Sequence, residues 1–256
     1  NNLGSALFSL GDYSAARTIH EDGAHRSFEI GYQMGEGDHL DNIGGTAWAV
    51  GDYSLAIAQY RAALEIRDRM DDAWGVAISN SNLGGAYRAQ GDPAKGLDLY
   101  RRALDIDREI GRRRGEAYDL HGIGLCQLDM GHYNLASEAL GQAASIREEL
   151  GEEHLANESH VACAVAMLRR GDEPAATSLV DRMLERENDS MFDGAVETTA
   201  TLLRCVEVIA ETEPDRATAL RAFTSDRVAE RAGRISDPDQ RESYLRSVEA
   251  HRDSRT

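Results

Sequence analysis

Three asparagines spaced forty residues apart are the side chains in this sequence best suited to hydrogen bonding with a partner. Each amide offers one acceptor and two donors, which match the C=O and N–H groups of an extended peptide backbone without selecting any particular side chain. They are Asn2, Asn42 and Asn82. A second interpretation stays open, in which these amides serve helix packing or bond to a neighbouring part of their own chain.

Residue types that catalyse reactions or bind metal ions are present, but without the spacing that such chemistry needs. Two histidine pairs are five and six residues apart, which puts the partners on different faces of a helix. These pairs are His20 with His25 and His154 with His160. The segment 91–96 lacks the glycine spacing and the Lys-Ser/Thr ending of a phosphate-binding loop. We therefore expect no enzymatic activity, no cofactor and no metal site in this chain.

A forty-residue repeat organises the sequence. The same turn glycine recurs five times, and a small-residue motif ending in glycine precedes the first four by seven residues. The turn glycines are Gly11, Gly51, Gly91, Gly131 and Gly171, and the motif glycines are Gly4, Gly44, Gly84 and Gly124. A period of this length is typical of arrays in which each small unit stacks on its neighbours to bury an apolar face. Function is then expected on a long surface.

A second set of repeated positions follows each turn. Small residues recur forty apart, and a larger residue stands four positions after each of them. The small residues are Ala16, Ala56, Gly96, Ala136 and Ala176, and those four positions later are His20, Tyr60, Tyr100, Leu140 and Val180. This spacing predicts two packed helices per unit, whose small residues allow close approach. Glycine suits the left-handed end of the first helix, and the Asp after it can cap the second.

Taken together, these residues resemble the tetratricopeptide repeat, in its forty-residue variety, over residues 1–187. The resemblance implies an all-α fold, a right-handed superhelix of antiparallel helix pairs, with five pairs in this range. The register places the first residue inside a helix, so we expect the first pair to be truncated and further sequence to lie upstream.

The resemblance also implies a binding groove on the concave side, lined by the first helix of each pair. The asparagine ladder would face a bound peptide there, together with residues that flank it. The flanking candidates are Asp41, Ser81, His121, Trp48, Arg88 and Tyr118. For Trp48 two interpretations remain, an exposed anchor for the ligand or packing between hairpins.

The last seventy residues depart from the repeat. Residues 188–234 keep an apolar periodicity that predicts a divergent sixth helix pair, and residues 235–256 predict a capping helix and tail. Asp237 and Pro238 suit a helix start, with Gln240 completing a capping box. Tyr244 and Leu245 lie on an apolar stripe that could close the solenoid.

The tail also resembles the end of the repeat regions of large bacterial signalling proteins. The resemblance rests on Ile235-Ser236-Asp237-Pro238, Arg241 and Tyr244-Leu245. In those proteins a nucleotide cyclase or DNA-binding domain and a P-loop ATPase precede the repeats. It implies that this chain is the C-terminal regulatory arm of such a protein.

Charge restricts the partners. The 45 acidic and 28 basic side chains give a net charge of −17, which disfavours general binding to nucleic acid or anionic lipid. No apolar stretch has the roughly 20 residues of a membrane span, and no signal peptide is visible, so we expect a cytoplasmic protein. The basic run 112–114 allows two interpretations, a dock for an acidic peptide or a solvated helix start.

The sequence therefore predicts a non-catalytic protein–protein interaction scaffold that binds a protein or peptide segment in its groove. One alternative is an intramolecular switch that holds its own upstream domains, and another is a small-ligand sensor. Oligomers are possible with each of these functions.

Overall fold

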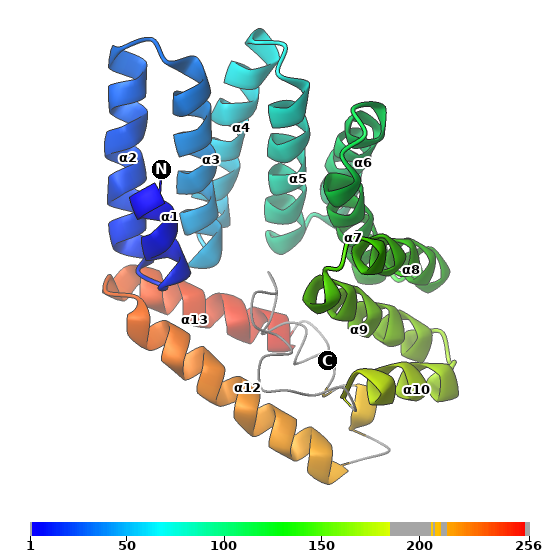
Figure 1. The fold of residues 1–256 in the computed structure, drawn as a ribbon. Coiled ribbons are helices and arrows are strands. Elements are labelled where there is room, and N and C mark those ends of the chain that lie inside the picture. Colours follow the sequence, from blue (N-terminus) through cyan, green and yellow to red (C-terminus); the bar gives the residue numbers. More distant parts are fainter. Residues whose placement is uncertain (1, 185–205, 207, 211–213, 254–256) are drawn as a thin grey trace. The chain divides into compact units, whose positions relative to one another are not determined.

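Helices make up the fold in the computed structural model, which describes residues 2–184, 206, 208–210 and 214–253 (Figure 1). No strand occurs among these residues. The helices are α1 (Asn2–Ser9), α2 (Tyr13–Glu29), α3 (Gln33–Ala49), α4 (Tyr53–Arg69), α5 (Ala73–Ala89), α6 (Pro93–Glu109), α7 (Arg113–Asp129), α8 (Tyr133–Glu149), α9 (Glu153–Arg169), α10 (Glu173–Leu184), α12 (Pro214–Arg234) and α13 (Pro238–Asp253). Consecutive helices pack in pairs, which confirms the predicted all-α class.

The left-handed turn recurs every twenty residues, between the hairpins as well as within them, whereas the sequence predicted it only within the hairpins. Eight glycines at these turns have positive φ, between 70° and 94°. They are Gly11, Gly31, Gly51, Gly91, Gly111, Gly131, Gly151 and Gly171. Asp71 takes the remaining position in this series, with φ 53°. The left-handed turn therefore separates the hairpins from one another as well as the two helices within each hairpin.

Aspartates begin the second helix of the first three hairpins, as predicted. The carboxylate of Asp12 accepts a hydrogen bond from the backbone N–H of Ala15 at 3.1 Å. Asp52 and Asp92 make the equivalent bonds, also at 3.1 Å. Each carboxylate satisfies one of the N–H groups that have no partner within the helix.

Motif glycines are required because a large side chain lies directly on them within the same hairpin. A Cβ added at Gly44 would lie 2.6 Å from the ring of Tyr60, and one at Gly124 would lie 2.5 Å from Cγ of Leu140. Such distances are shorter than real Cβ contacts, so the two helices could not pack this closely if a larger residue replaced either glycine.

Gly124→Ala is expected to destabilise the chain, whereas Gly141→Ala is expected to stabilise it. Both glycines lie inside helices, but nothing lies within 4 Å of a Cβ at Gly141. Alanine there gains about 1 kcal/mol of helix propensity. At Gly124 overpacking costs about 1–3 kcal/mol and outweighs that gain. Urea unfolding followed by circular dichroism measures both, and shifts of the same sign would contradict the predicted packing.

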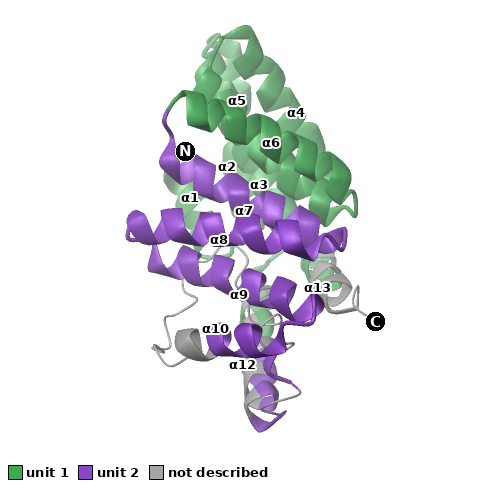
Figure 2. Ribbon diagram, turned by 90° about the vertical axis from the view of Figure 1, so that its right-hand side faces the viewer, with its two compact units in different colours: residues 1–110, 228–256 green, residues 111–227 purple. Residues whose placement is uncertain are grey.

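Two compact units divide the chain, one of residues 1–110 with 228–256 and the other of residues 111–227 (Figure 2). The second unit contains α7 to α10, and its core includes buried residues from 206–209. Members of this core are Val161, Ala164, Val165, Ala176, Val180, Val206, Val208, Ile209 and Ala217. Of the predicted sixth helix pair, 188–234, residues 188–205, 207 and 211–213 lie outside the described residues, and α12 covers Pro214–Arg234.

In the first unit, residues near the two ends of the sequence pack together. Figure 1 shows α13 lying against the ends of α2 and α3. Their shared apolar cluster contains Tyr13, Val50, Ala232, Ile235 and Tyr244, all of them buried. Ser236 Oγ also donates a hydrogen bond to Asp12 Oδ1 at 3.3 Å. The last helix therefore covers an apolar edge of the first two hairpins.

The start of α13 follows the prediction in part. Asp237 accepts hydrogen bonds from the backbone N–H groups of Asp239 and Gln240, at 2.9 and 3.0 Å. Pro238 is the first helical residue. Within the described part of the chain, Gln240 Oε1 has no hydrogen-bond partner, so the reciprocal half of the capping box is not formed. Tyr244 is buried while Leu245 is exposed, so the predicted stripe is narrower than expected.

Cys126 and Cys163 are free and buried, and burial raises the pKa of the Cys163 thiol. Cys205 lies outside the described residues. Among the helices that the structure describes, none combines the length and the apolar character that a membrane span requires.

Candidate peptide-binding surface

Two neighbouring helices of the first unit, α3 and α5, contact each other and present partly exposed residues at matching positions. These positions are three or four residues apart, so they form one face on each helix. We call this surface the α3–α5 stripe; it comprises Met34, Asp38, Asn42, Gly45 and Ala49 on α3 with Trp74, Ile78, Asn82, Gly85 and Ala89 on α5. Each residue of one helix stands forty positions from its counterpart on the other.

The asparagines of the ladder differ in how their amides are used. Asn42 Nδ2 donates to the carbonyl O of Asp38, one turn earlier in the same helix, at 2.8 Å. For Asn82, the described residues provide no hydrogen bond to the side chain, and it is only half-buried. Asn2 is exposed on α1. The self-bonding interpretation therefore applies to Asn42, while the Asn82 amide is available to a ligand.

Two glycines leave the middle of the stripe without side chains. A Cβ at Gly45 would meet only Tyr60 Oη, at 3.8 Å, and one at Gly85 would meet only Tyr100 Oη, at 3.1 Å. A ligand backbone could approach this part of both helices closely. The tyrosine hydroxyls lie directly beneath it.

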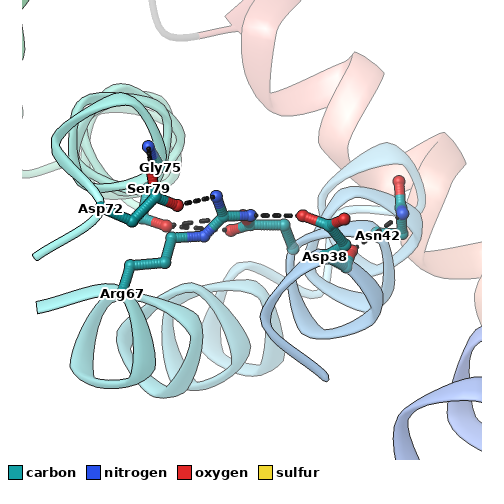
Figure 3. Close-up of polar contacts among 7 residues, drawn as sticks. Asp38, Asn42, Arg67, Asp72, Gly75 and Ser79 are labelled. Atoms are coloured by element: carbon teal, nitrogen blue, oxygen red, sulfur yellow. Dashed lines mark hydrogen bonds and ion pairs between the residues drawn. The ribbon is translucent and has the colours of Figure 1, made fainter. Parts of the chain in front are cut away.

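A buried guanidinium lies next to the stripe and gathers three carboxylates (Figure 3). Arg67 of α4 has a side chain only 8% exposed. Its Nη2 lies 2.9 Å from Asp38 Oδ1 and 2.7 Å from Asp41 Oδ2, and its Nη1 lies 3.3 Å from Asp72 Oδ2. Ser79 Oγ also donates to Asp41 at 3.3 Å. We call these five residues the Arg67 cluster.

The Arg67 cluster carries a net negative charge at pH 7. Burial raises the pKa of Asp41 from 3.8 to about 6, against the opposing effects of Arg67 and the Ser79 hydrogen bond. Asp41 is therefore mostly ionised at pH 7, and three carboxylates exceed one guanidinium. Asp38 is the outermost of them, with 40% of its side chain exposed.

The second unit contains an equivalent centre eighty residues later in the sequence. Arg147 Nη1 donates to the carbonyl O of Leu155 at 2.7 Å and to Ser159 Oγ at 2.6 Å. His121 Nδ1 lies 3.0 Å from the same hydroxyl. Arg147 and Ser159 thus stand at the positions of Arg67 and Ser79, with His121 at the position of Asp41, although the hydrogen bonds differ.

The structure therefore places one row of predicted groove residues inside the helix packing. Asp41 and His121 lie in the two arginine centres, and the buried Ser81 donates to the carbonyl O of Ala77 at 2.9 Å. These residues precede the ladder positions by one, which turns them about 100° around the helix and toward a neighbouring helix. The sequence contains one indication of this burial, because Arg67 and Arg147 stand at the same position of the forty-residue repeat, two units apart.

The aromatic and basic candidates also lie mostly in the packing. Trp48 is partly buried against a core cluster of α3, α4 and α5, which agrees with its packing interpretation. Arg88 is buried in the first unit, and Tyr118 is half-buried in the second. Trp74 was not among the predicted groove residues, although it is 56% exposed on the stripe. The sequence could have indicated it, because Trp74 stands about two helical turns before Asn82 on the same helix face.

Two residues of the basic run 112–114 form ion pairs on the surface of the second unit. Arg113 pairs with Glu116 at 2.6 Å and with Glu149 at 2.8 Å, and Arg114 pairs with Glu152. This arrangement agrees with a solvated helix start.

A polar cavity of about 560 Å³ lies at the other end of the stripe, beside the start of α13. Residues of α3, α4, α5 and α13 line it, including Thr46, Ser54, Gln90, Asp239 and Gln240. No group of three or more His, Cys, Asp or Glu able to hold a metal ion occurs in the parts of the chain that are described.

Comparison with known proteins supports the tetratricopeptide repeat family. Two tetratricopeptide repeat models match residues 1–27 and 75–149. No curated protein matches the chain.

Solved structures with a similar fold include two Rap proteins and BtubC. The Rap conjugation gene regulator of plasmid pLS20, in complex with the Phr* peptide, is 15% identical with TM-score 0.72, covering 99% of this chain and 74% of its own. A Rap protein complexed with Competence and Sporulation Factor is 15% identical with TM-score 0.69, covering 98% and 72%. BtubC from P. vanneervenii is 17% identical with TM-score 0.66, covering 83% and 92%. Likeness at this identity shows the fold alone.

Proposed function

We propose that this chain is a non-catalytic scaffold that binds an extended protein or peptide segment on the α3–α5 stripe. The observation that carries the proposal is the combination of the Asn82 amide, which has no side-chain hydrogen bond within the described residues, with the smooth surface beside it at Gly85. An amide on such a surface can donate to one backbone C=O and accept from one N–H of an extended segment.

Two further observations support the proposal. The exposed Trp74 and Met34 offer apolar surface at one end of the same stripe. The Rap conjugation gene regulator, whose fold is similar, was solved with the Phr* peptide bound to it. We propose further that the chain acts as the C-terminal regulatory arm of a larger bacterial signalling or transcription-regulatory protein in the cytoplasm, as the tail resemblance implies.

Asn82→Ala is expected to weaken peptide binding at least about fivefold, since each hydrogen bond lost contributes on the order of 1 kcal/mol. Asn42→Ala should have a smaller effect, because its Nδ2 already bonds to the carbonyl O of Asp38. Peptides selected from a random linear library displayed on phage supply the ligands, and fluorescence anisotropy measures their affinities.

Asn134→Ala is the matched control, since Asn134 is an exposed helical asparagine outside the stripe. Equal affinity of the Asn82→Ala variant and the control would contradict an amide contact at this position. Failure of the parent chain to enrich any peptide would contradict the proposed function.

A segment of the same polypeptide is the second candidate ligand. Within the first unit, a segment of the chain, residues 232–244, already packs on the edge formed by Tyr13 and Val50. An intramolecular switch of this kind would release upstream domains when an external segment displaces them. Peptide binding that weakens when those domains are added in cis distinguishes this alternative from a scaffold for foreign proteins.

A further inference from the structure

The α3–α5 stripe changes character along its length, and this change indicates what its partner carries. At the N-terminal ends of the two helices the stripe begins with Met34, 50% exposed, and Trp74, 56% exposed. The end of α2 and the turn before α3 add further exposed apolar residues. They are Phe28, Ile30 and Tyr32. Large apolar side chains gathered on a surface in this way are typical of an interaction site.

One helical turn further along α3 the stripe becomes negatively charged. Asp38 follows Met34 by four residues, which places it about 6 Å along the helix axis. It is the exposed member of the Arg67 cluster, in which carboxylates outnumber the single guanidinium. Helix α3 contains no lysine or arginine, and neither does α5 before Arg88. A basic side chain arriving here would meet no like charge from either helix.

An extended segment matches this spacing. Side chains two residues apart point to the same side of a strand and lie about 6.6–7 Å from each other. A large apolar side chain on Met34 and Trp74 would therefore bring the side chain two positions away close to Asp38. The charge of the Arg67 cluster makes a lysine or arginine the complementary residue at that position.

We infer that the partner is an extended segment with a lysine or arginine two positions from a large apolar residue, the apolar side chain packing on Met34 and Trp74 and the basic one pairing with Asp38. The inference rests on the proposed function and names the chemistry of its ligand. It holds for either direction of the segment, because both directions give the same spacing.

A random linear peptide library displayed on phage, selected on the full chain, tests this pattern. The expected result is enrichment of a basic residue two positions from a large apolar one. Selection on Asp38→Asn should lose the basic residue and keep the apolar one, and selection on Trp74→Ala should lose the apolar one. Enriched peptides that lack the pattern would overturn the inference while leaving the proposed function intact. No enrichment at all would overturn both.

Affinities of one enriched peptide give a second readout. Asp38→Asn is expected to weaken binding about two- to fivefold at low salt, and the loss should shrink as salt screens the pair. Replacing the peptide lysine or arginine by glutamine should weaken binding to the parent but not to Asp38→Asn. Asp98→Asn is the control, an exposed acid in α6 of the same unit. If the losses of binding free energy from Asp38→Asn and from the peptide substitution add up in the doubly changed complex, the proposed ion pair is overturned.

Discussion

Arg67→Met is expected to lower the free energy of unfolding by about 3–5 kcal/mol, the largest effect we predict for a single side chain. The methionine fills much of the space of the arginine but supplies no charge. Asp41, which is buried and 2.7 Å from the guanidinium, would then keep a carboxylate without a counter-charge. Asp38 and Asp72 would lose their ion pairs as well. Urea unfolding at pH 7.5 measures the loss.

The deficit of Arg67→Met should shrink as the pH falls. The pKa of Asp41 is raised to about 6 in the folded chain, so the folded state binds this proton more tightly than the unfolded state. The contribution of Asp41 to stability therefore falls as pH rises from about 3.8 to 6. Removing Arg67 raises this pKa further, and the missing counter-charge matters only where the carboxylate is ionised. At pH 5 most of the loss of unfolding free energy that is due to Asp41 should have disappeared.

Arg69→Met is the control, because Arg69 is exposed on the same helix. Its effect should stay within about 0.5 kcal/mol at both pH values. Equal losses for the two arginines, or a deficit at Arg67 that grows toward pH 5, would refute the role assigned to the Arg67 cluster.

Ile235→Ala is expected to loosen the packing of α13 on the first hairpins by about 2–5 kcal/mol. Ile235 is fully buried in the cluster with Tyr13 and Val50, so its removal leaves a cavity. Hydrogen exchange of the backbone amides in 238–246 measures the local opening, which should speed up about 30-fold or more. Leu245→Ala, at an exposed position in the same helix, should change the exchange rates little. Equal acceleration by both variants would show that the cluster does not hold the helix in place.

The helix pairs and their caps could be predicted because they follow from short-range patterns. Turn glycines, the aspartates after them and the motif glycines all act within one hairpin, so a repeat of forty residues reveals them. The left-handed residues between hairpins were missed. They are Gly31, Gly111 and Gly151, and Asp71 interrupts the series at the second of its four positions.

Side-chain burial across hairpins could not be predicted in the same way. Asp41 looks like a surface residue in sequence, and its partner Arg67 lies 26 positions away on another helix. The side of the helix that a polar residue occupies depends on that distant partner. The ladder positions Asn42 and Asn82 do lie on a partly exposed stripe, and their role in binding remains a prediction.

The packing of residues 232–244 on Tyr13 and Val50 also bears on when the first unit can finish folding. A ribosome makes the first two hairpins long before it reaches Ile235, and at about 5–20 residues per second the delay is roughly 10–40 s. Throughout that time the apolar edge of Tyr13 and Val50 has no cover from α13. A nascent chain of this protein would therefore present a site for chaperones, and for premature association with other nascent chains, that the finished chain conceals.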